Sequence, residues 1–531
     1  MQKKFKICLR VYGIINRITV SEGIPMMSET RKKHIKAGVG VFLILLANII
    51  FFLTLWLLQK YDRIYFDQIL YQITTSAAGT PPGLSWSAIT YGFLGLLSTS
   101  FLIFLYLFLS GNLKRIFGRF QRYTAYSSKK LCAFFQKRVL PLSLAVLISA
   151  SAFFLIRLDV IGYVYRTNVD SDFIEMNYKD PSNTEISFPE EKRNLIYIFL
   201  ESMETTYGDT AAGGPITTDF TPELSLLAKE NVSFSHTSGK GGALPYAGTM
   251  WTAASMVAQT AGVTVKVPLT GNEYGENGSY MPGAITLGDI LRDAGYTQTI
   301  IMGSDAEFAC RYEYFSEHGD YDILDIDALK EAGRLPQDYR EWWGFEDEKM
   351  FAFAKEELAR LSSGEEPFNL TLLTADTHFP DGYGCSSCPD THENQYANVI
   401  SCSSRQVYDF ISWVQEQPFY ENTTIVLSGD HLTMDPEFLK GVDENYVRTT
   451  YNCIINSAVE PVNEKNRQFG AFDMLPTTLA AMGAEIEGNR LALGTNLFSG
   501  EKTLTEQYGY EFLDNELMKE SEFYNKRFFG K

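Results

Sequence analysis

Charged side chains are missing from three stretches of the first 157 residues. Residues 37–59, 88–110 and 139–156 contain no Asp, Glu, Lys or Arg. A helix needs about 20 apolar residues to cross a bilayer, so the first two stretches are long enough and the third only just meets the requirement. We therefore expect three membrane-spanning helices, with buried core helices as the alternative. None of the stretches shows the pattern of a cleavable signal peptide.

Acidic side chains are also missing between the second and third stretches. Residues 111–138 carry eight Lys or Arg and no Asp or Glu. Further basic residues precede the first stretch: Arg31, Lys32, Lys33 and Lys36. Basic loops stay in the cytoplasm, so we expect residues 1–36 and this loop to be cytoplasmic. Three crossings within 37–157 would then place the chain from about residue 160 onward outside the cell membrane.

Basic side chains are scarce in the remainder of the chain. Residues 1–158 hold 20 basic and 4 acidic side chains, which leaves 26 basic and 60 acidic ones for the rest of the chain. Nucleic-acid binding requires clusters of Lys and Arg, so the acidic outer part is not expected to bind nucleic acid. Its length is sufficient for a large hydrophobic core.

Cysteine is infrequent, with seven residues in the chain. Cys8 and Cys132 would lie on the cytoplasmic side or at the membrane edge, and the others would lie outside: Cys310, Cys385, Cys388, Cys402 and Cys453. The CxxC of Cys385 and Cys388 has no second CxxC to complete a zinc site. We expect instead a disulfide that involves Cys385, Cys388 or Cys402, and five outer cysteines leave one unpaired.

The outer part alternates apolar runs of strand length with helical patterns. Residues 158–190 are polar and are expected to be a linker, 191–500 an α/β domain, and 501–531 a polar tail of unassigned role. The predicted strands are 194–200, 231–236, 298–302, 368–373, 423–427 and 451–455, and the predicted helices are 222–230, 286–294, 347–362, 394–415 and 473–482. This alternation predicts a mostly parallel sheet flanked by helices on both faces.

Polar side chains follow four of the predicted strands. In order they are Glu201-Ser202, Asp305 with Arg311, Asp376 with His378, and Asp430-His431. Parallel strands form sites at their carboxyl ends, so these groups should meet at one edge of the sheet. A carboxylate beside an imidazole suits Mn²⁺ or Zn²⁺, and Glu201 could converge on Asp430 and His431. For Asp376, helix capping is an equal alternative to a functional role.

A nucleophile could come from the glycine-rich segment 239–252. Thr252 stands where a helix is predicted to begin, and the positive end of the helix dipole and a nearby dication would both favour its alkoxide. The alternative is that Thr249 or Thr252 simply caps the helix.

Together these motifs resemble the alkaline-phosphatase/sulfatase superfamily, and more narrowly its lipoteichoic-acid synthases and glucan-type phosphoglycerol transferases. The matching segments are IFLES (198–202), GTMWT (248–252), FACR (308–311), DTHFPDG (376–382) and SGDH (428–431). The resemblance implies that Glu201, Thr252, Asp430 and His431 hold Mn²⁺, with Mg²⁺ or Zn²⁺ as alternatives. It implies that Thr252 is the nucleophile, and that Arg311 and His378 bind the substrate, with His378 also acting as the proton donor.

The resemblance also implies a reaction. The expected activity is transfer of glycerophosphate from phosphatidylglycerol to an envelope glycan, glycolipid or lipoteichoic-acid acceptor, at a bacterial cell membrane with the catalytic domain extracellular or periplasmic. Lipoteichoic-acid synthases usually have five spans rather than three, which leaves the acceptor open. The C/S-x-P-x-R segment of true sulfatases is missing, so sulfate-ester hydrolysis is not expected. Phosphoethanolamine transfer and a non-catalytic role in envelope assembly are the alternatives.

Overall fold

The computed structural model describes residues 28–530 except 62–63, 65, 76–81, 110–120, 268–273, 276–277 and 444. Contacts divide the chain into two units. The first comprises Met1–Leu55 and Ser87–Phe154, and the second comprises Trp56–Trp86 and Leu155–Lys531. Cys8 and much of the predicted cytoplasmic N-terminus lie outside the described residues.

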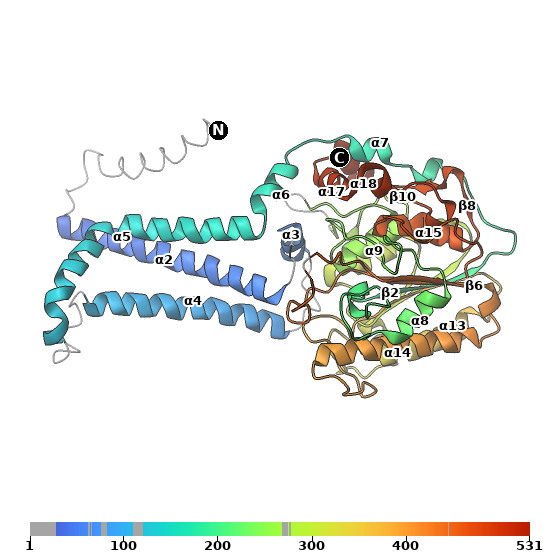
Figure 1. Ribbon diagram of the computed structural model, residues 1–531, viewed down its shortest axis with the longest axis horizontal. Helices are drawn as coiled ribbons and strands as arrows, with labels where there is room; N and C mark the ends of the chain where they lie inside the picture. Colours follow the sequence, from blue (N-terminus) through green and yellow to red (C-terminus); the bar gives the residue numbers. More distant parts are fainter. Residues whose placement is uncertain are drawn as a thin grey trace. The chain divides into compact units, whose positions relative to one another are not determined.

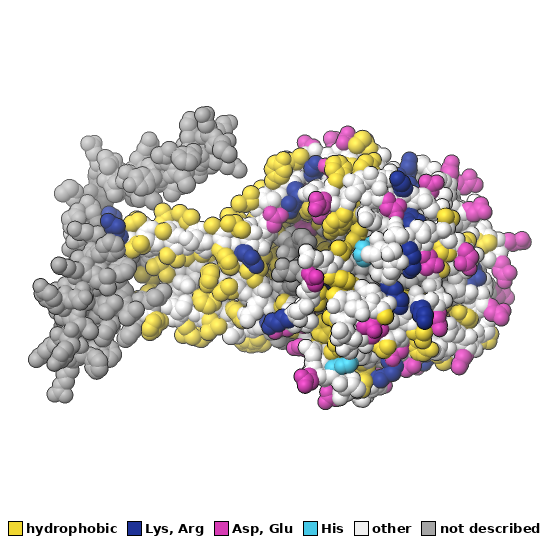
Figure 2. All heavy atoms as spheres, in the orientation of Figure 1, with side chains coloured by type: hydrophobic (Ala, Val, Ile, Leu, Met, Phe, Trp, Pro, Cys, Tyr) yellow, Lys and Arg dark blue, Asp and Glu magenta, His cyan; other side chains and the backbone are white. Residues whose placement is uncertain are grey.

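Long helices cover the described residues of the three uncharged stretches (Figure 1). They are α2 (Glu29–Lys60), α4 (Pro82–Leu109) and α5 (Gln121–Arg157). Two segments, Gly38–Lys60 and Leu140–Arg157, are long and apolar enough to cross a membrane. Several α4 side chains lie outside the described residues, so the structure supports two of the three expected spans and the middle one stays a prediction. Hydrophobic side chains dominate the visible face of these helices, whereas acidic ones are scattered over the second unit (Figure 2).

The second unit is built on a six-stranded sheet with the order β4-β3-β5-β2-β6-β7. Its strands are β2 (Asn194–Leu200), β3 (Thr297–Met302), β4 (Asp322–Leu324), β5 (Phe368–Leu373), β6 (Thr423–Gly429) and β7 (Asn452–Ile455). Every neighbouring pair is parallel except β6 and β7, which are antiparallel. The expected α/β class with a mostly parallel sheet is therefore confirmed, with an antiparallel edge strand.

Alternating side chains of the central strand β2 fill two cores. Leu195, Tyr197 and Phe199 belong to one hydrophobic cluster, and the intervening Ile196, Ile198 and Leu200 belong to the other. This alternation follows from the two-residue period of a strand. Helices cover both faces, which is why β2 is apolar at nearly every position. The helices α9 (Thr252–Ala261) and α15 (Met474–Ala481) pack on one face, and α8 (Pro222–Glu230), α13 (Asp347–Leu361) and α14 (Gln395–Gln415) on the other.

Most predicted elements are present, including α10 (Leu287–Asp293), which Thr286 caps at its N-terminus. The predicted strand at 231–236 is wrong. Only Val232 pairs there, through an isolated bridge to Ile454. Two residues further on, the backbone amide of Phe234 donates to the side-chain oxygen of Asn452 at 2.9 Å. A side chain therefore replaces the backbone ladder that a strand would have used.

The segments on either side of the predicted α/β domain also pack into the second unit. Residues 158–190 include α6 (Val160–Arg166) and α7 (Phe173–Asn177), and Phe173 and Ile174 are buried. The last residues form α16 (Leu504–Tyr508), α17 (Tyr510–Met518) and α18 (Glu522–Phe529). Their apolar side chains, among them Leu513 and Phe528, belong to the hydrophobic cluster that also contains Leu195, Tyr197 and Phe199 of β2.

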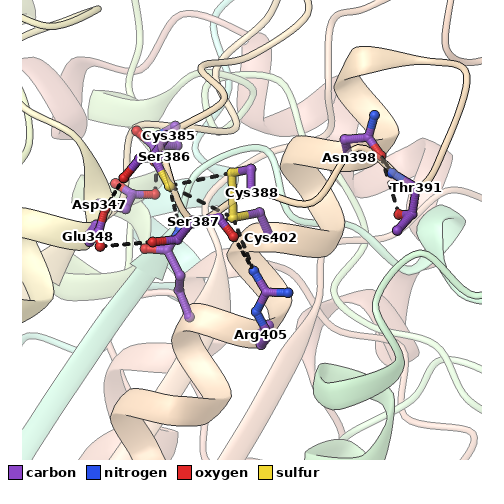
Figure 3. The surroundings of a disulfide bond; sticks show 12 residues. Asp347, Glu348, Cys385, Ser386, Ser387, Cys388, Thr391, Asn398, Cys402 and Arg405 are labelled. Atoms are coloured by element: carbon purple, nitrogen blue, oxygen red, sulfur yellow. Dashed lines mark hydrogen bonds between the residues drawn. A yellow bond between two sulfur atoms is a disulfide. The ribbon is translucent and has the colours of Figure 1, made fainter.

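A disulfide joins Cys388 to Cys402 on α14 (Figure 3). The expectation that one of the three neighbouring cysteines forms a disulfide is therefore confirmed. The third of them, Cys385, is free, and its sulfur lies 3.5 Å from that of Cys388. Cys453 is also free and buried, so together with Cys385 at least two outer cysteines are unpaired where a single one was expected.

Candidate functional site

Three buried side chains meet where β2 and β6 end. Glu201 follows β2 directly, and Asp430 and His431 follow β6. Leu200 of β2 is in register with Gly429 of β6, so the residues that follow these two strands are brought side by side. Ligand atoms of the three side chains lie within 4.8 Å of one another, although their strands are more than 200 residues apart in the sequence.

The geometry of His431 suits a metal ligand. Its Nδ1 lies 2.9 Å from the Leu432 carbonyl oxygen, which can only accept, so the proton resides on Nδ1. The lone pair of Nε2 then faces the cluster. That atom lies 3.5 Å from Glu201 Oε1 and 3.5 Å from Asp430 Oδ2. A carbonyl that fixes the ring tautomer in this way is the usual support of a metal-binding histidine.

The carboxylates are arranged for a cation. Asp430 Oδ2 is buried and has no hydrogen-bond partner among the described residues. Burial and the charge of Glu201 raise the pKa of Asp430 to about 8. Burial acts to lower the pKa of His431, but the charges of Asp430 and Glu201 outweigh it and raise that pKa. Two buried carboxyl groups and an imidazole nitrogen at such spacing fit a divalent cation such as Mn²⁺ or Zn²⁺.

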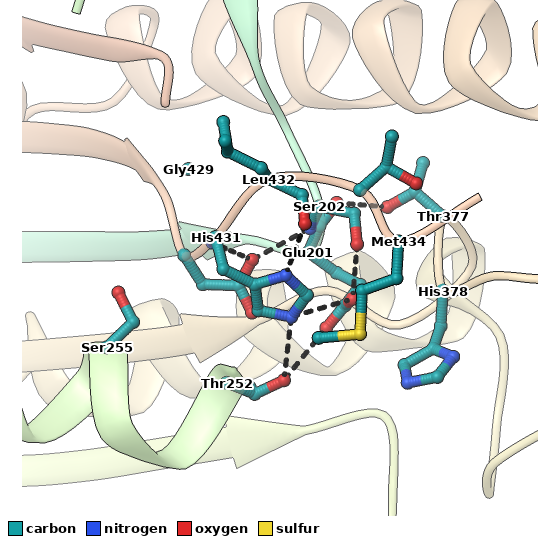
Figure 4. A network of polar contacts seen from close by, with 12 residues as sticks. Glu201, Ser202, Thr252, Ser255, Thr377, His378, Gly429, His431, Leu432 and Met434 are labelled. Carbon is teal, nitrogen blue, oxygen red and sulfur yellow. Dashed lines mark hydrogen bonds and ion pairs between the residues drawn. The ribbon is translucent and has the colours of Figure 1, made fainter. Parts of the chain in front are cut away.

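Thr252 is the first residue of α9 and faces this cluster (Figure 4). Its Oγ1 lies 3.3 Å from Glu201 Oε2 and 3.4 Å from His431 Nε2. It does not cap the helix, because the capping position is Trp251 and no side chain caps there. The hydroxyl therefore stands at the positive end of the α9 dipole with its oxygen directed at the candidate metal ligands.

Thr249 has a different environment. Its Oγ1 donates to the Tyr246 carbonyl at 2.8 Å and accepts from the Tyr246 amide at 3.2 Å. Thr249 is buried and its hydroxyl is engaged in a local turn. Thr252, the residue that the sequence analysis chose as the nucleophile, thus contacts the carboxylate and imidazole cluster, and Thr249 does not.

Arg311 begins α11 (Arg311–Glu317) and is held by backbone carbonyls. Its Nε donates to the Phe308 carbonyl at 3.0 Å, and Nη2 donates to that of Asp305 at 2.6 Å. The third nitrogen, Nη1, makes no hydrogen bond among the described residues. Arg311 is buried and lines the same cavity as Glu201 and Thr252, so a cation borders the space that the Thr252 hydroxyl also borders.

His378 lines this cavity as well. Its Nδ1 donates to the Phe379 carbonyl at 2.7 Å, which leaves Nε2 as the atom that can exchange a proton. The ring packs against Trp343, with 4.4 Å between ring centroids. Burial lowers the pKa of His378, and the charge of Glu201 opposes this shift. In Figure 4 the ring lies to one side of the cluster around His431.

Two other predicted polar groups stay apart from the site. Asp305 accepts from the Glu307 amide and so stabilises a turn. Asp376 is buried, caps no helix, and both carboxylate oxygens are without a hydrogen-bond partner among the described residues. Burial and the nearby Asp347 raise the pKa of Asp376 to about 9. Neither residue lines the cavity that contains Thr252.

The structure adds supporting residues to which sequence reasoning gave no role. Ser202 adopts a φ of 52°, which lets its amide donate to Asp430 Oδ1 at 2.7 Å while its hydroxyl donates to Glu201 Oε1 at 2.7 Å. Thr374 accepts from the Glu201 amide at 2.8 Å. The one sequence feature that could have indicated a supporting role for Ser202 is its position directly after Glu201 in the IFLES segment. These contacts hold both carboxylates in place.

This chain is similar to a known protein family and to bacterial transferases. The family model described as Sulfatase matches residues 193–484. Phosphoglycerol transferase I of Escherichia coli (strain SMS-3-5 / SECEC) is 37% identical over 338 residues, which is 62% of this chain and 42% of that protein. The counterpart from Escherichia fergusonii is 36% identical over 272 residues, or 50% of this chain and 34% of that protein. The chain therefore spans less than half the length of these relatives.

Two solved structures are similar to parts of the chain. The lipoteichoic acid synthase LtaP from Listeria monocytogenes is 17% identical, with 62% of this chain and 80% of that chain covered and a TM-score of 0.45. The phosphoethanolamine transferase EptA from Neisseria meningitidis is 14% identical, with 84% of both chains covered and a TM-score of 0.47. The family match spans more than half of the chain and includes Glu201, Thr252, Arg311, His378, Asp430 and His431. This chain therefore belongs to the sulfatase family of the alkaline-phosphatase/sulfatase superfamily.

Proposed function

We propose that this protein transfers glycerophosphate from phosphatidylglycerol to a glycan or glycolipid of the bacterial envelope, through a covalent intermediate on Thr252. The observation that carries the proposal is the placement of the Thr252 hydroxyl, which faces Glu201 and His431 while Arg311 and His378 line the same cavity. The 37% identity to phosphoglycerol transferase I supports the choice of the group transferred.

In the first step, Thr252 gives up its hydroxyl proton to solvent, and its Oγ1 attacks the phosphorus of phosphatidylglycerol as an alkoxide. The bond between phosphorus and the diacylglycerol oxygen breaks, and glycerophosphate is left on the threonine. Nη1 of Arg311 is free to bind a phosphoryl oxygen and to stabilise the charge that develops on it. The negative phosphodiester opposes the effect of burial on His378 and favours its protonated form, so Nε2 can give its proton to the departing diacylglycerol.

In the second step, an acceptor hydroxyl attacks the same phosphorus. His378, now neutral, takes the proton of that hydroxyl at Nε2, and the bond to Thr252 Oγ1 breaks. The threonine is restored as its alkoxide, His378 is protonated again, and the acceptor carries glycerophosphate. The same imidazole donates a proton in the first step and accepts one in the second, so it acts first as general acid and then as general base.

A divalent cation held by Glu201, Asp430 and His431 would lower the pKa of the Thr252 hydroxyl and stabilise charge on the phosphoryl oxygens. Mn²⁺ is our proposal for the ion, because two carboxylates and one imidazole are ligands that it accepts. Threonine occupies the nucleophile position, and the chain lacks the C/S-x-P-x-R segment. Phosphodiester transfer is therefore proposed in place of sulfate-ester hydrolysis.

The test is incubation of the purified full chain, in detergent micelles with Mn²⁺, with phosphatidylglycerol that carries label in its acyl chains. We expect release of labelled diacylglycerol that stops when EDTA removes the metal. Phosphatidylethanolamine with the same acyl chains is the matched control donor. Release from phosphatidylethanolamine alone would reject phosphoglycerol transfer in favour of phosphoethanolamine transfer, and release from neither lipid would reject both.

A further inference from the structure

A second, larger cavity opens beside Thr252. Its volume is about 340 Å³, and it shares Thr252, Arg311 and His378 with the catalytic cavity. Away from these residues its wall is mainly aromatic and aliphatic and includes Tyr61, Ile69, Ile73, Trp251, Phe379 and Met434. The cavity thus has polar groups at the nucleophile and the buried arginine, and a wall that is otherwise mainly apolar, with Gln68 and Gln72 as its polar members.

Part of this wall comes from a segment far away in the sequence. Tyr61, Ile64, Ile69 and Ile73 lie in or just before α3 (Phe66–Thr74), which Figure 1 labels beside the sheet domain. Residues 56–86 belong to the second unit by their contacts. The candidate span Gly38–Lys60 ends immediately before this segment. Part of the wall of the cavity is therefore formed by residues that follow directly on a candidate membrane-spanning helix.

The helix α3 is built into the catalytic core. Tyr71 is 1% exposed and donates to the Ala309 carbonyl at 2.8 Å, and its oxygen lies 2.9 Å from that of Tyr280. Its ring centroid is 5.1 Å from that of Trp251, the residue before Thr252. Nearby, the rings of Tyr61 and Phe379 lie 5.1 Å apart. These contacts tie α3 to the loops that carry the nucleophile, the arginine and His378.

We propose that this cavity is the subsite for the apolar part of the lipid donor: it holds the ester-linked glycerol and the first carbons of the acyl chains while the phosphodiester lies at Thr252 and Arg311. The proposal rests on the proposed function, because it assigns the cavity to the same donor. The bond that must be cleaved joins a phosphate to a diacylglycerol. The polar groups of the cavity suit the phosphate, and its mainly apolar wall suits the diacylglycerol.

Chemistry and size favour this occupant over the acceptor. A glycan carries hydroxyl groups that need hydrogen-bond partners, and an apolar wall leaves them unsatisfied at a cost. Ligand pockets of about 300–1,000 Å³ bury most of a small molecule, and this cavity lies at the lower end of that range. It is too small for two whole acyl chains. We infer that their distal parts stay outside the cavity.

Binding is measured on the full-length Thr252→Ala protein, so that no turnover occurs. The two ligands are dihexanoyl phosphatidylglycerol, a short-chain soluble form of the donor, and glycerophosphoglycerol, its deacylated counterpart. The fluorescence of Trp251 and Trp343, which line the cavity, reports binding. We expect the acylated ligand to bind at least about tenfold more tightly, which corresponds to the burial of about two methylene groups.

Two further variants in the same background locate the effect. Ile73 lines the cavity and is 71% exposed, so Ile73→Glu should fold and should reduce the preference for the acylated ligand about tenfold. The control is Ile161→Glu, in which an isoleucine that is 63% exposed and outside the cavity receives the same charge, and there the preference should persist. Circular dichroism checks that each variant is folded.

Each result of these binding measurements supports or overturns the assignment of the cavity. Equal affinity for the two ligands, or an unchanged preference in Ile73→Glu, overturns the assignment of the cavity to the acyl end. A fluorescence change with an oligosaccharide and none with the acylated lipid assigns it to the acceptor instead. If the wild-type protein releases no diacylglycerol and yet Thr252→Ala prefers the acylated ligand, the proposed reaction fails while the lipid subsite stands.

Discussion

Alanine substitutions of the two threonines in segment 248–252 should have opposite effects: one should abolish activity, and the other should lower stability. Thr252→Ala removes the hydroxyl that faces Glu201 and His431, and we expect turnover to fall by at least about 10⁴-fold, because a missing nucleophile has no substitute. Its two contacts are long, at 3.3 and 3.4 Å, so their loss should cost under about 1 kcal/mol of the unfolding free energy. Alanine has the higher helix propensity, which offsets up to about 0.7 kcal/mol of this cost.

Thr249→Ala should behave in the opposite way. Thr249 is buried, and its hydroxyl bonds both the amide and the carbonyl of Tyr246. The substitution leaves the Tyr246 amide without its acceptor inside the protein, which should lower the unfolding free energy by about 1–3 kcal/mol. Thr249 lies outside the metal cluster, so turnover should stay within about tenfold of the wild type, the range expected when a group away from the reacting atoms is removed.

Three measurements on the detergent-solubilised full chain check this pair of expectations. Diacylglycerol release reports turnover, thermal unfolding ranks the stabilities, and mass spectrometry of protein trapped with phosphatidylglycerol locates the adduct. We expect glycerophosphate on the peptide that contains Thr252. Measurable turnover in Thr252→Ala, or an adduct on Thr249 or Ser202, would refute the reasoning. A stable but inactive Thr249→Ala protein would show that the roles are reversed.

Three further predictions follow from the metal cluster, the topology and a buried ion pair. Asp430→Asn should bind Mn²⁺ at least about 100-fold more weakly while remaining folded, and full metal occupancy of that variant would remove Asp430 from the ligand set. In intact cells an impermeant thiol reagent should label Met176→Cys and not Cys132, and labelling of both or of neither would contradict an outer catalytic domain. His318 lies 3.0 Å from Asp289; burial acts to lower the pKa of His318, but the hydrogen bond and charge of Asp289 raise it. A histidine whose pKa is raised in the folded state contributes its full stabilisation at pH values below its unfolded pKa of about 6.5, and this stabilisation is lost as the pH rises through its folded pKa. The unfolding temperature of the wild type should therefore fall over that pH window, and that of His318→Gln should not.

Local patterns in the sequence were sufficient to predict most strands of the sheet and the residues of the candidate metal cluster. The run at 194–200 is apolar at nearly every position, which is typical of a strand covered on both faces, and the structure places β2 there. Glu201, Asp430 and His431 were found because each follows such a strand, and parallel strands bring their carboxyl ends to one edge. The same reasoning failed at 231–236, where an asparagine side chain of β7 takes the hydrogen bond that a strand would have made.

The sequence by itself determined the uncharged helices, the α/β class and the polar residues at the strand ends, because these depend on periodicity and on the order of elements along the chain. Only the tertiary structure decided that Thr252 rather than Thr249 faces the cluster, that Cys388 pairs with Cys402, and that α3 forms a wall of the site. Each of these depends on contacts between distant residues. Tyr71 meets Tyr280 and Ala309 across more than 200 positions, and no local pattern records such a contact.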